Sequence, residues 1–382
     1  MKKAVNASMK LIFAPDSYKG SLSALNVAAR MAEGAQRVYP SSTCQLLPMA
    51  DGGEGTLEAV MLARGGMQAD MQVCGPNGDT VTTRYGVMMD GTAVIEMALS
   101  SGLPLMKRKL DPLAATSYGT GEVIRMAAPN AIKLAVGLGG SATNDGGMGL
   151  LSALGVKFYD ENDDLLRGSG AELIRVRRVD FSGLDLNVLA LPMDVMCDVD
   201  NPLLGEKGAT YVYGPQKGAD AQTLNDLERG MENYVRVMNA ALGRDISTFP
   251  GAGAAGGVGA ALCGVLGARR LSGAETVLDL MAFDEKLQDA AVCFTGEGRM
   301  DGQSIQYGKA PTAVAARCRK QGVPCIAVVG GIGPGGQAFC QKGQSVISIA
   351  NGPLSLDECL IHAGDLVADA VERALRIYDM RA

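Results

Sequence analysis

Short apolar runs alternate with helix-like patterns at both ends of this chain, and this alternation restricts the possible fold more than any other feature. Near the N-terminus, an apolar run at residues 11–14 precedes a helical pattern over 22–38. Near the C-terminus, the runs 291–294 and 325–329 lie on either side of a helical pattern over 312–321. Strands that are joined by helices favour a parallel sheet made of βαβ units. We therefore expect the two ends of the chain to share one parallel α/β domain.

The middle of the chain has a different pattern. Two runs at residues 82–89 and 92–97 flank Asp90-Gly91, which is a strong signal for a β-hairpin. Antiparallel pairing is therefore expected there. The same region predicts a mostly apolar strand over 188–197, which Pro192 interrupts. It also predicts that the glycine-alanine stretch after Pro250 continues as a helix to about residue 268.

These patterns predict an α/β protein with two α/β domains. The first is a discontinuous, Rossmann-like parallel domain of residues 9–80 plus 285–382, and the second is an inserted mixed-sheet domain of residues 81–284. Residues 1–8 are expected to be a short N-terminal extension. A contiguous two-domain division is the alternative that the pattern leaves open. The length of 382 residues is consistent with two domains.

Charge and cysteine content exclude several classes of protein. The formal charge of −6 disfavours a nucleic-acid groove, although a local basic pocket for an anion is compatible with it. Nine cysteines are scattered without a C-x-x-C pair, which indicates free thiols in a reducing cytosol and neither a disulfide framework nor a zinc site. No apolar run approaches the roughly 18–20 residues of a membrane span. We expect a cytoplasmic protein that binds neither nucleic acid nor membrane.

Glycine is abundant and unevenly distributed. The chain has 51 glycines, and nearly half of them lie in five short segments: 51–55, 137–149, 251–259, 296–308 and 330–336. Glycine lets backbone N–H groups approach a ligand closely, and most of these segments adjoin carboxylates, lysines or hydroxyls. Tight turns alone explain one such cluster easily but several of them poorly. We expect phosphate or carboxylate binding.

Several nucleotide-binding and catalytic motifs can be weighed against this expectation. The segments 137–142 and 251–256 both fit a dinucleotide fingerprint, but glycines follow the first where a helix should begin and Pro250 precedes the second. A Walker A motif is absent, because Ala310 follows Lys309 where Ser or Thr should bind Mg²⁺. The single histidine, His362, lies among acidic residues at helical spacing and is expected on a solvated helix face.

The remaining chemistry uses lysines, carboxylates and hydroxyls. The strand at 11–14 is followed by Asp16, Ser17 and Lys19, at the sheet edge where ligands bind in open α/β folds. Asp51 and Glu54 lie on a glycine turn, where their roles are either helix capping or Mg²⁺ ligation. Further groups are formed by Ser141, Asn144 and Asp145, by Asp194, Asp198 and Asp200, and by Glu297, Asp301 and Lys309. This combination suits phosphoryl transfer, in which an enzyme mainly positions groups and neutralises charge.

The ordered set of these segments resembles the bacterial glycerate kinase family, the type without a Walker motif. The segments that carry the resemblance are 14–23, 49–56, 137–147, 250–257 and 295–299, together with 197–202 and 213–218. The resemblance runs from about residue 10 to 375. It implies ATP-dependent phosphorylation of D-glycerate, commonly at the 2-hydroxyl, with Mg²⁺ as cofactor and a cleft between two α/β domains as the active site.

The expected roles follow from this resemblance and from the residue types. Substrate binding is assigned to Asp16, Ser17, Lys19, Gly52 and Gly53. ATP binding is assigned to Gly139, Gly140, Ser141, Asn144, Gly253, Gly256, Gly257 and Lys309. Mg²⁺ ligation is assigned to Asp51, Glu54 and Glu297. Asp198 is the first candidate and Asp301 the second for the base that accepts the hydroxyl proton, while Lys19 or Lys309 neutralises the transferred phosphoryl group.

Two other functions remain open at this stage. An NAD(P)-dependent oxidoreductase would use one of the dinucleotide fingerprints, and a non-catalytic sugar-acid-binding protein would need one anion site but no nucleotide-sized second set of glycine loops. The expected partners are D-glycerate and ATP, and a homo-oligomer is compatible with the sequence.

Overall fold

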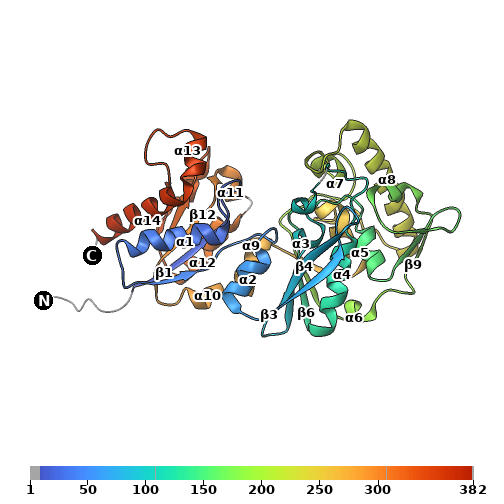
Figure 1. Ribbon diagram of the computed structural model, residues 1–382, viewed down its shortest axis with the longest axis horizontal. Coiled ribbons are helices and arrows are strands. Elements are labelled where there is room, and N and C mark those ends of the chain that lie inside the picture. Colours follow the sequence, from blue (N-terminus) through green and yellow to red (C-terminus); the bar gives the residue numbers. More distant parts are fainter. Residues whose placement is uncertain (1–8, 108, 307, 381–382) are drawn as a thin grey trace. The chain divides into compact units, whose positions relative to one another are not determined.

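The computed structural model describes residues 9–107, 109–306 and 308–380, so the expected extension over 1–8 lies outside the described residues. The chain separates into two compact α/β units (Figure 1). Unit 1 comprises the chain up to Asp51, Glu58–Arg64 and Ala274 onward, and unit 2 comprises Gly52–Leu57 and Gly65–Gly273.

Unit 1 contains a five-stranded parallel sheet, which confirms the predicted parallel α/β fold at the two ends of the chain. The strand order is β16-β14-β12-β1-β2. The strands are β1 (Lys10–Pro15), β2 (Thr43–Leu46), β12 (Ala290–Gly296), β14 (Cys325–Val329) and β16 (Gln344–Ser348). β1 pairs with β12 although about 280 residues separate them in the sequence, with Phe13 beside Phe294 in the register.

Two helices pack closely in unit 1. Ser23 caps α1 (Ala24–Gln36) by accepting a hydrogen bond from the backbone N–H of Asn26. The buried face of α1 packs against α14 (Ala363–Asp379) and shares a core with β1 and β12. A Cβ at Gly34 would overlap with the backbone carbonyl of Ala368, so this helix contact requires glycine.

The other elements of unit 1 surround the sheet. The helix α12 (Ala310–Gln321) packs against β12 and β14. The shorter elements are α9 (Gly273–Leu280), whose first residue belongs to unit 2, α10 (Phe283–Lys286), β13 (Arg299–Met300), α11 (Gly302–Gln306), β15 (Gly331–Ile332), a 3₁₀ turn (Gly336–Phe339) and α13 (Leu356–Ile361). His362 is exposed between α13 and α14, as expected of a residue on a solvated helix face.

Unit 2 contains a six-stranded mixed sheet in the order β11-β10-β6-β5-β4-β3. Its strands are β3 (Met67–Cys74), β4 (Thr80–Val87), β5 (Thr92–Glu96), β6 (Lys133–Gly137), β10 (Met193–Met196) and β11 (Arg269–Leu271). β3, β4 and β5 pair antiparallel, whereas β5, β6, β10 and β11 pair parallel. The predicted hairpin is confirmed, and Gly91 at its turn has a φ of 82°.

Helices and a small sheet complete unit 2. The helices are α2 (Thr56–Arg64), whose later residues belong to unit 1, α3 (Ala98–Ser101), α4 (Tyr118–Ala127), α5 (Met148–Ala153), α6 (Leu186–Leu189), α7 (Ala209–Tyr213) and α8 (Ala221–Leu242). Short 3₁₀ turns occupy Leu103–Leu105, Ala128–Asn130, Gly170–Arg175 and Pro215–Lys217. A three-stranded sheet joins β7 (Lys157–Tyr159), β8 (Leu165–Leu166) and β9 (Arg178–Asp180). Among the described residues, no helix has the length and apolar character needed to cross a membrane.

The bounds of the units differ from the expected domain limits of 80/81 and 284/285. Residues 65–80 lie in unit 2, because β3 pairs with β4 along its whole length. Residues 274–284 lie in unit 1, where Arg317 of α12 forms ion pairs with Glu275, Asp279 and Asp284.

Two elements differ from the sequence-based prediction. Residues 188–197 were expected to form a strand interrupted by Pro192, but the chain forms α6 before the proline and β10 directly after it. Proline lacks the N–H that a ladder needs, so the strand starts beyond it. The stretch 251–268 forms a 3₁₀ turn (Ala254–Gly257) and a π-helix (Ala260–Val265) instead of one helix, because Ala255 and Gly256 have left-handed backbone angles.

Candidate active site

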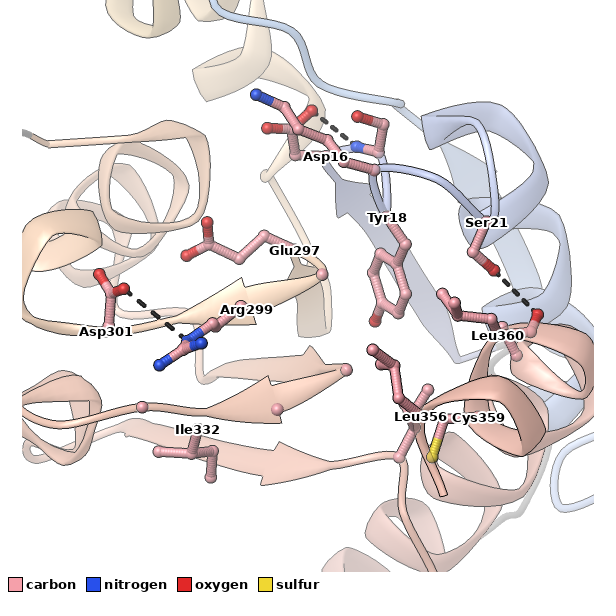
Figure 2. A pocket seen from close by; sticks show the side chains of 18 of the residues that line it. Asp16, Tyr18, Ser21, Glu297, Arg299, Asp301, Ile332, Leu356, Cys359 and Leu360 are labelled. Carbon is pink, nitrogen blue, oxygen red and sulfur yellow. Dashed lines mark hydrogen bonds and ion pairs between the residues drawn. The ribbon is translucent and has the colours of Figure 1, made fainter. Parts of the chain in front are cut away.

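A pocket of about 640 Å³ lies in unit 1 (Figure 2). Segments that follow the carboxyl ends of its parallel strands supply most of the polar lining: Asp16 follows β1, Glu297 follows β12 and Gly330 follows β14. The order of the sheet reverses between β1 and β12, since β2 lies on one side of β1 and the later strands lie on the other. Ligands of open α/β sheets bind in the crevice at such a reversal. The pocket therefore occupies the position that the fold favours for a ligand.

Asp16 is a partly buried carboxylate at this reversal. Its Oδ1 accepts a hydrogen bond of 2.6 Å from the backbone N–H of Ser17. Burial and the nearby charge of Asp51 raise the pKa of Asp16 to about 6, against the opposing effects of the Ser17 N–H and Lys19. A carboxyl group with this pKa can exchange a proton near neutral pH.

Glu297 lies beside Asp16 in the pocket and is 6% exposed. Burial raises the pKa of Glu297, with contributions from the charges of Asp16 and Asp301, while Ser304 and Lys309 oppose the shift. Its Oε1 has no hydrogen-bond partner among the described residues. A buried carboxylate oxygen without a partner is costly, and a bound cation or a ligand proton donor would satisfy it.

Asp301 and the basic side chains form another part of the lining. Oδ1 of Asp301 accepts hydrogen bonds from the backbone N–H groups of Gln303 and Ser304 at the start of α11. The Arg299 guanidinium lies 4.0 Å from the Asp301 carboxylate. Lys309 immediately precedes α12, and its side chain is exposed.

The opposite wall of the pocket is apolar. Figure 2 shows Leu356 and Leu360 of α13 on the side away from Asp301 and Arg299, and Ile332 also lines the pocket. The Ser21 hydroxyl donates a hydrogen bond of 3.2 Å to the backbone carbonyl of Leu360, which links the loop after β1 to α13. The pocket can therefore accept a ligand that has both a charged and an apolar part.

Tyr18 lies between the polar and the apolar wall of the pocket (Figure 2). It is 3% exposed, and its hydroxyl donates a hydrogen bond of 2.7 Å to the carbonyl of Val328 in β14. This bond ties the loop that carries Asp16, Ser17 and Lys19 to the sheet. Tyr18 was not among the predicted site residues, although it lies within the same motif.

Unit 2 holds the other predicted binding residues. Close packing requires glycine at several of these positions. A Cβ at Gly139 would overlap with the backbone of Gly53, and its N–H donates a hydrogen bond of 3.0 Å to the carbonyl of Gly52. The segment of Gly52 and Gly53 therefore lies directly against the loop that follows β6. Gly140 has a φ of 74°, which places its peptide in the left-handed region.

The second glycine cluster packs against the same loop. A Cβ at Gly256 would overlap with the carbonyl of Thr143, and one at Gly257 would lie 2.6 Å from the Cα of Gly146. The N–H of Gly253 donates a hydrogen bond of 3.0 Å to the carbonyl of Asn201. Close backbone packing accounts for glycine at these positions.

Lys217 lies beneath the loop of residues 139–145 and is 2% exposed. Its ammonium group donates hydrogen bonds to the Ser141 hydroxyl at 3.1 Å and to the Thr143 carbonyl at 2.6 Å. Burial lowers the pKa of Lys217 to about 8, and the charge of Asp145 opposes that shift. Sequence reasoning placed this residue in a family segment, 213–218, but gave it no role.

The side chains of Asp145 and Asn144 complete this buried loop. Asp145 is fully buried and accepts hydrogen bonds from the N–H groups of Ser117, Gly147 and Gly149 and from the Ser117 hydroxyl. It therefore holds the loop in shape. Asn144 donates to the Thr210 hydroxyl, whereas its Oδ1 has no hydrogen-bond partner among the described residues.

The three predicted aspartates near β10 have separate surroundings. Asp194 is buried in β10 and forms ion pairs with Lys133 and Arg269. Asp200 pairs with Arg270. Asp198 is exposed after the carboxyl end of β10, and its carboxylate accepts a hydrogen bond of 2.8 Å from the N–H of Gly273.

The structure thus places the predicted residues in two groups. The unit 1 pocket brings together Asp16, Ser17, Lys19, Asp51, Glu297, Asp301 and Lys309. Unit 2 holds Gly52, Gly53, Glu54, Gly139, Gly140, Ser141, Asn144, Asp198, Gly253, Gly256 and Gly257. Pocket residues to which the sequence analysis gave no role include Tyr18, Ser21, Arg299 and the apolar side chains of α13.

Neither dinucleotide fingerprint has the local structure that such a motif needs. After β6 the chain runs through a loop of ten residues before α5 begins at Met148, whereas a dinucleotide site has a tight strand–helix turn. The segment at Gly251 follows turns and bends instead of a strand.

Comparisons with known proteins agree with the resemblance of the motifs. The model of the glycerate kinase family matches residues 11–379. The chain is 42% identical to "Glycerate kinase" of Halalkalibacterium halodurans, over 94% of this chain and 96% of that protein. It is 42% identical to "Glycerate 2-kinase" of Escherichia coli, over 95% of this chain and 96% of that protein.

A solved structure extends the likeness to the fold. The crystal structure of the putative glycerate kinase 2 from Salmonella typhimurium LT2 is similar with a TM-score of 0.84 and 38% sequence identity. The match covers 98% of this chain and 99% of that chain. Together with the family match over nearly the whole sequence, this confirms the resemblance: the chain belongs to the glycerate kinase family.

Proposed function

We propose that this protein transfers the terminal phosphoryl group of ATP to D-glycerate, with the 2-hydroxyl as acceptor and 2-phosphoglycerate as product. The observation that carries the proposal is the pocket in unit 1, where carboxylates with raised pKa values lie beside Lys19 and Lys309 in a chain of the glycerate kinase family. The name of the Escherichia coli relative, glycerate 2-kinase, supports the choice of the 2-hydroxyl.

Glycerate is a small hydroxy acid, so its site needs a cation for the carboxylate and polar partners for the hydroxyls. Lys19 and Ser17 offer an ammonium group and a hydroxyl on the loop after β1. Gly52 and Gly53, which follow Asp51 in the sequence, are the further substrate-binding candidates. The pocket is larger than a three-carbon acid requires, because pockets of roughly 300–1,000 Å³ hold ligands of drug size.

Asp16 is the carboxylate that we assign as the base for the attacking hydroxyl. Its pKa of about 6 is close to the working pH, which favours proton transfer in both directions. Asp301 and Asp198, the candidates from sequence, already accept hydrogen bonds from backbone N–H groups, Asp301 at the start of α11 and Asp198 from Gly273. They remain the alternatives against which Asp16 is tested.

Mg²⁺ fits the acidic end of the pocket. The free Oε1 of Glu297 and the repulsion of Asp16 by Asp51 both indicate carboxylates that a cation would stabilise. Asp51 and Glu297 would hold the ion, while Glu54, the third predicted ligand, lies on unit 2. When bound, Mg²⁺ supplies charge neutralisation for the polyphosphate of ATP.

The loop of residues 139–145 is our candidate for the polyphosphate. The buried ammonium of Lys217 gives this loop a positive charge that the sequence analysis did not anticipate. Gly140, Ser141 and Asn144 are its candidate contacts, and Lys309 in unit 1 and Gly253, Gly256 and Gly257 in unit 2 are the remaining candidates for ATP. Lys19 and Lys309 would neutralise charge on the transferred group.

A coupled assay of ADP release tests the proposal. We expect turnover that requires both D-glycerate and ATP, with L-glycerate and an acceptor-free reaction as matched controls. Phosphorus NMR of the product distinguishes 2-phosphoglycerate from 3-phosphoglycerate. Binding of D-glycerate or tartronate without ADP release would favour a sugar-acid-binding protein. A change in NAD(P)H absorbance with these acids would favour an oxidoreductase.

A further inference from the structure

Three cysteines that come from three different elements form a cluster in unit 1. Cys293 lies on β12, Cys325 on β14 and Cys318 on α12. Their sulfur atoms all lie within 4.8 Å of one another. All three side chains are buried, with exposed fractions of 0%, 1% and 0% respectively. None of them lines the pocket of the proposed active site.

The fold places these thiols on one side of the sheet. Cys293 and Cys325 are directly paired in the register of two neighbouring parallel strands. The helix α12 packs against both strands and carries Cys318 near its C-terminal end. The sequence spacing shows no C-x-x-C pair, which explains why the sequence analysis predicted scattered free thiols. The three-dimensional arrangement instead resembles a trigonal set of sulfur ligands.

The size of the cluster suits one soft ion bonded to three sulfurs. A metal–sulfur distance of about 2.3 Å places the three sulfurs of a planar trigonal site about 4 Å apart. The observed limit of 4.8 Å lies close enough for small side-chain movements to reach that geometry. Oxygen-preferring ions such as Mg²⁺ are not expected here, because thiolates select soft, thiophilic elements.

The charge around the cluster restricts the oxidation state of the ion. Three thiolates on a divalent ion would leave a net negative charge in a buried site, which is unfavourable without a cation nearby. The charged group that acts on Cys318 is Asp284, an acid, which supplies no positive charge to offset three thiolates. Arg317, the next residue in the chain, is already paired with Glu275, Asp279 and Asp284. A trivalent element would give a neutral complex.

We propose that Cys293, Cys318 and Cys325 form a binding site for a neutral trivalent thiophilic metalloid, of which arsenous acid is the representative. Three As–O bonds of As(OH)₃ break and three As–S bonds form. The three thiol protons leave with the three hydroxyl groups as three molecules of water. No electron is transferred, so binding needs neither an oxidant nor a reductant, and the complex As(S-Cys)₃ carries no net charge.

Because the sulfur atoms are buried, the ligand enters only when α12 moves locally away from the strands. Binding is therefore expected to be slow compared with binding to an exposed cysteine.

The test uses the full-length protein, reduced with a phosphine and incubated with sodium arsenite. Native mass spectrometry is expected to show a mass increase of one arsenic less three hydrogens, and X-ray absorption is expected to show three As–S contacts and no As–O contact. Absence of bound arsenic after prolonged incubation, or a shell that retains oxygen, would overturn the proposal. Cadmium binding at the same site with equal affinity would overturn the argument from charge.

Variants identify the site. Cys293→Ala, Cys318→Ala and Cys325→Ala are each expected to lose the three-sulfur complex. Cys340→Ala, which changes an exposed cysteine of the same unit, and Cys197→Ala, which changes a buried cysteine of unit 2, are expected to retain it. Circular dichroism confirms folding, and Cys293→Val replaces Cys293→Ala if the smaller residue prevents it. Retention of the complex in all three cluster variants would contradict the assignment. The test does not depend on glycerate kinase activity, so its failure is distinguishable from failure of the proposed function.

Discussion

Asp16 and Glu297 directly follow Pro15 and Gly296, which pair across two neighbouring parallel strands. Burial, with the charge of Asp16 as a further contribution, raises the pKa of Glu297. Asp16 has a raised pKa for a similar reason, with burial and Asp51 as the causes. The acidic end of the pocket is thus built from groups whose charges are disfavoured until a ligand or cation arrives.

The pH dependence of the reaction is expected to report Asp16. If Asp16 is the base, kcat/KM rises as pH increases through about 6, because the ionised carboxylate is the active form. Asp16→Asn is expected to lower kcat by about 10²–10⁴-fold and to remove this acidic limb. Initial rates between pH 5 and pH 8 measure both effects. If Asp198→Asn or Asp301→Asn instead loses kcat and the acidic limb while Asp16→Asn stays near normal, then the affected aspartate is the base and Asp16 is not.

The same substitution is expected to stabilise the fold at neutral pH. The pKa of Asp16 is about 6 in the folded protein against a usual value of 3.8, so folding disfavours the ionised carboxylate. The stability that the protonated carboxyl group contributes is therefore lost as pH rises from about 4 to 6. Asp16→Asn should therefore increase the free energy of unfolding by about 2–3 kcal/mol at pH 7. Urea unfolding at pH 7 and below pH 4 provides the measurement. An equal change in the free energy of unfolding at both pH values would contradict this explanation.

Glu297 is expected to control the response to Mg²⁺. Replacing its carboxylate with an amide in Glu297→Gln removes one charged oxygen ligand, which should raise the Mg²⁺ concentration for half-maximal rate by about tenfold or more. Titration of the ADP-release rate with Mg²⁺ gives this value. Glu285→Gln is the control, since Glu285 is an exposed carboxylate of the same unit that does not line the pocket. An unchanged Mg²⁺ dependence in Glu297→Gln would exclude Glu297 as a ligand.

Lys217 is expected to affect ATP more than glycerate. Lys217→Met keeps much of the buried volume but removes the ammonium group that contacts Ser141 and Thr143. The KM for ATP should rise by about tenfold or more, because the candidate ATP loop loses a nearby positive charge and two charged hydrogen bonds, each worth about 1.5–3 kcal/mol, that hold its shape. Lys207→Met, at an exposed position of the same unit, is the matched control. A rise in the KM for glycerate alone would assign Lys217 to the other substrate.

The contact between α1 and α14 is expected to leave no space for an added methyl group. Gly34→Ala would improve helix propensity, but the new Cβ overlaps with the Ala368 carbonyl, so the variant should lose about 1–3 kcal/mol of unfolding free energy. Gly364→Ala is the matched control, because its Cβ would meet only the flexible side chain of Arg30 at 3.0 Å. Thermal unfolding of both variants tests this prediction. Equal stability of Gly34→Ala and Gly364→Ala would show that the two helices can move apart at little cost in free energy.

The sequence predicts local elements well where one pattern dominates. The helix at α12, the strand at β14 and the hairpin at Asp90-Gly91 all follow from short-range periodicity or turn chemistry. Pro192 shows the limit, because the apolar run that it interrupts was expected to be a strand over 188–197, whereas the chain forms α6 before the proline. The missing N–H of proline decides where the ladder begins, and this effect outweighs the apolar pattern.

The site was only partly predictable for a related reason. The residues that follow β1 and β12 could be recognised as candidates, because polar groups after parallel strands share one edge of the sheet. The role of Lys217 depends on a contact with Ser141 across 76 positions, which no local pattern contains. Likewise, the glycines at 256 and 257 suggested anion binding, whereas the structure shows that neighbouring backbone also requires them.

The pairing of β1 with β12 has a consequence for biosynthesis. When β1 leaves the ribosome, its partner β12 is still about 280 residues from being made, a delay of roughly tens of seconds at about 5–20 residues per second. Unit 2 lies almost wholly between the two strands in the sequence, so it can fold while β1, α1 and β2 wait. The nascent chain therefore presents the apolar segment Lys10–Pro15 without its central neighbour until β12 has been made, and the pocket forms only after that.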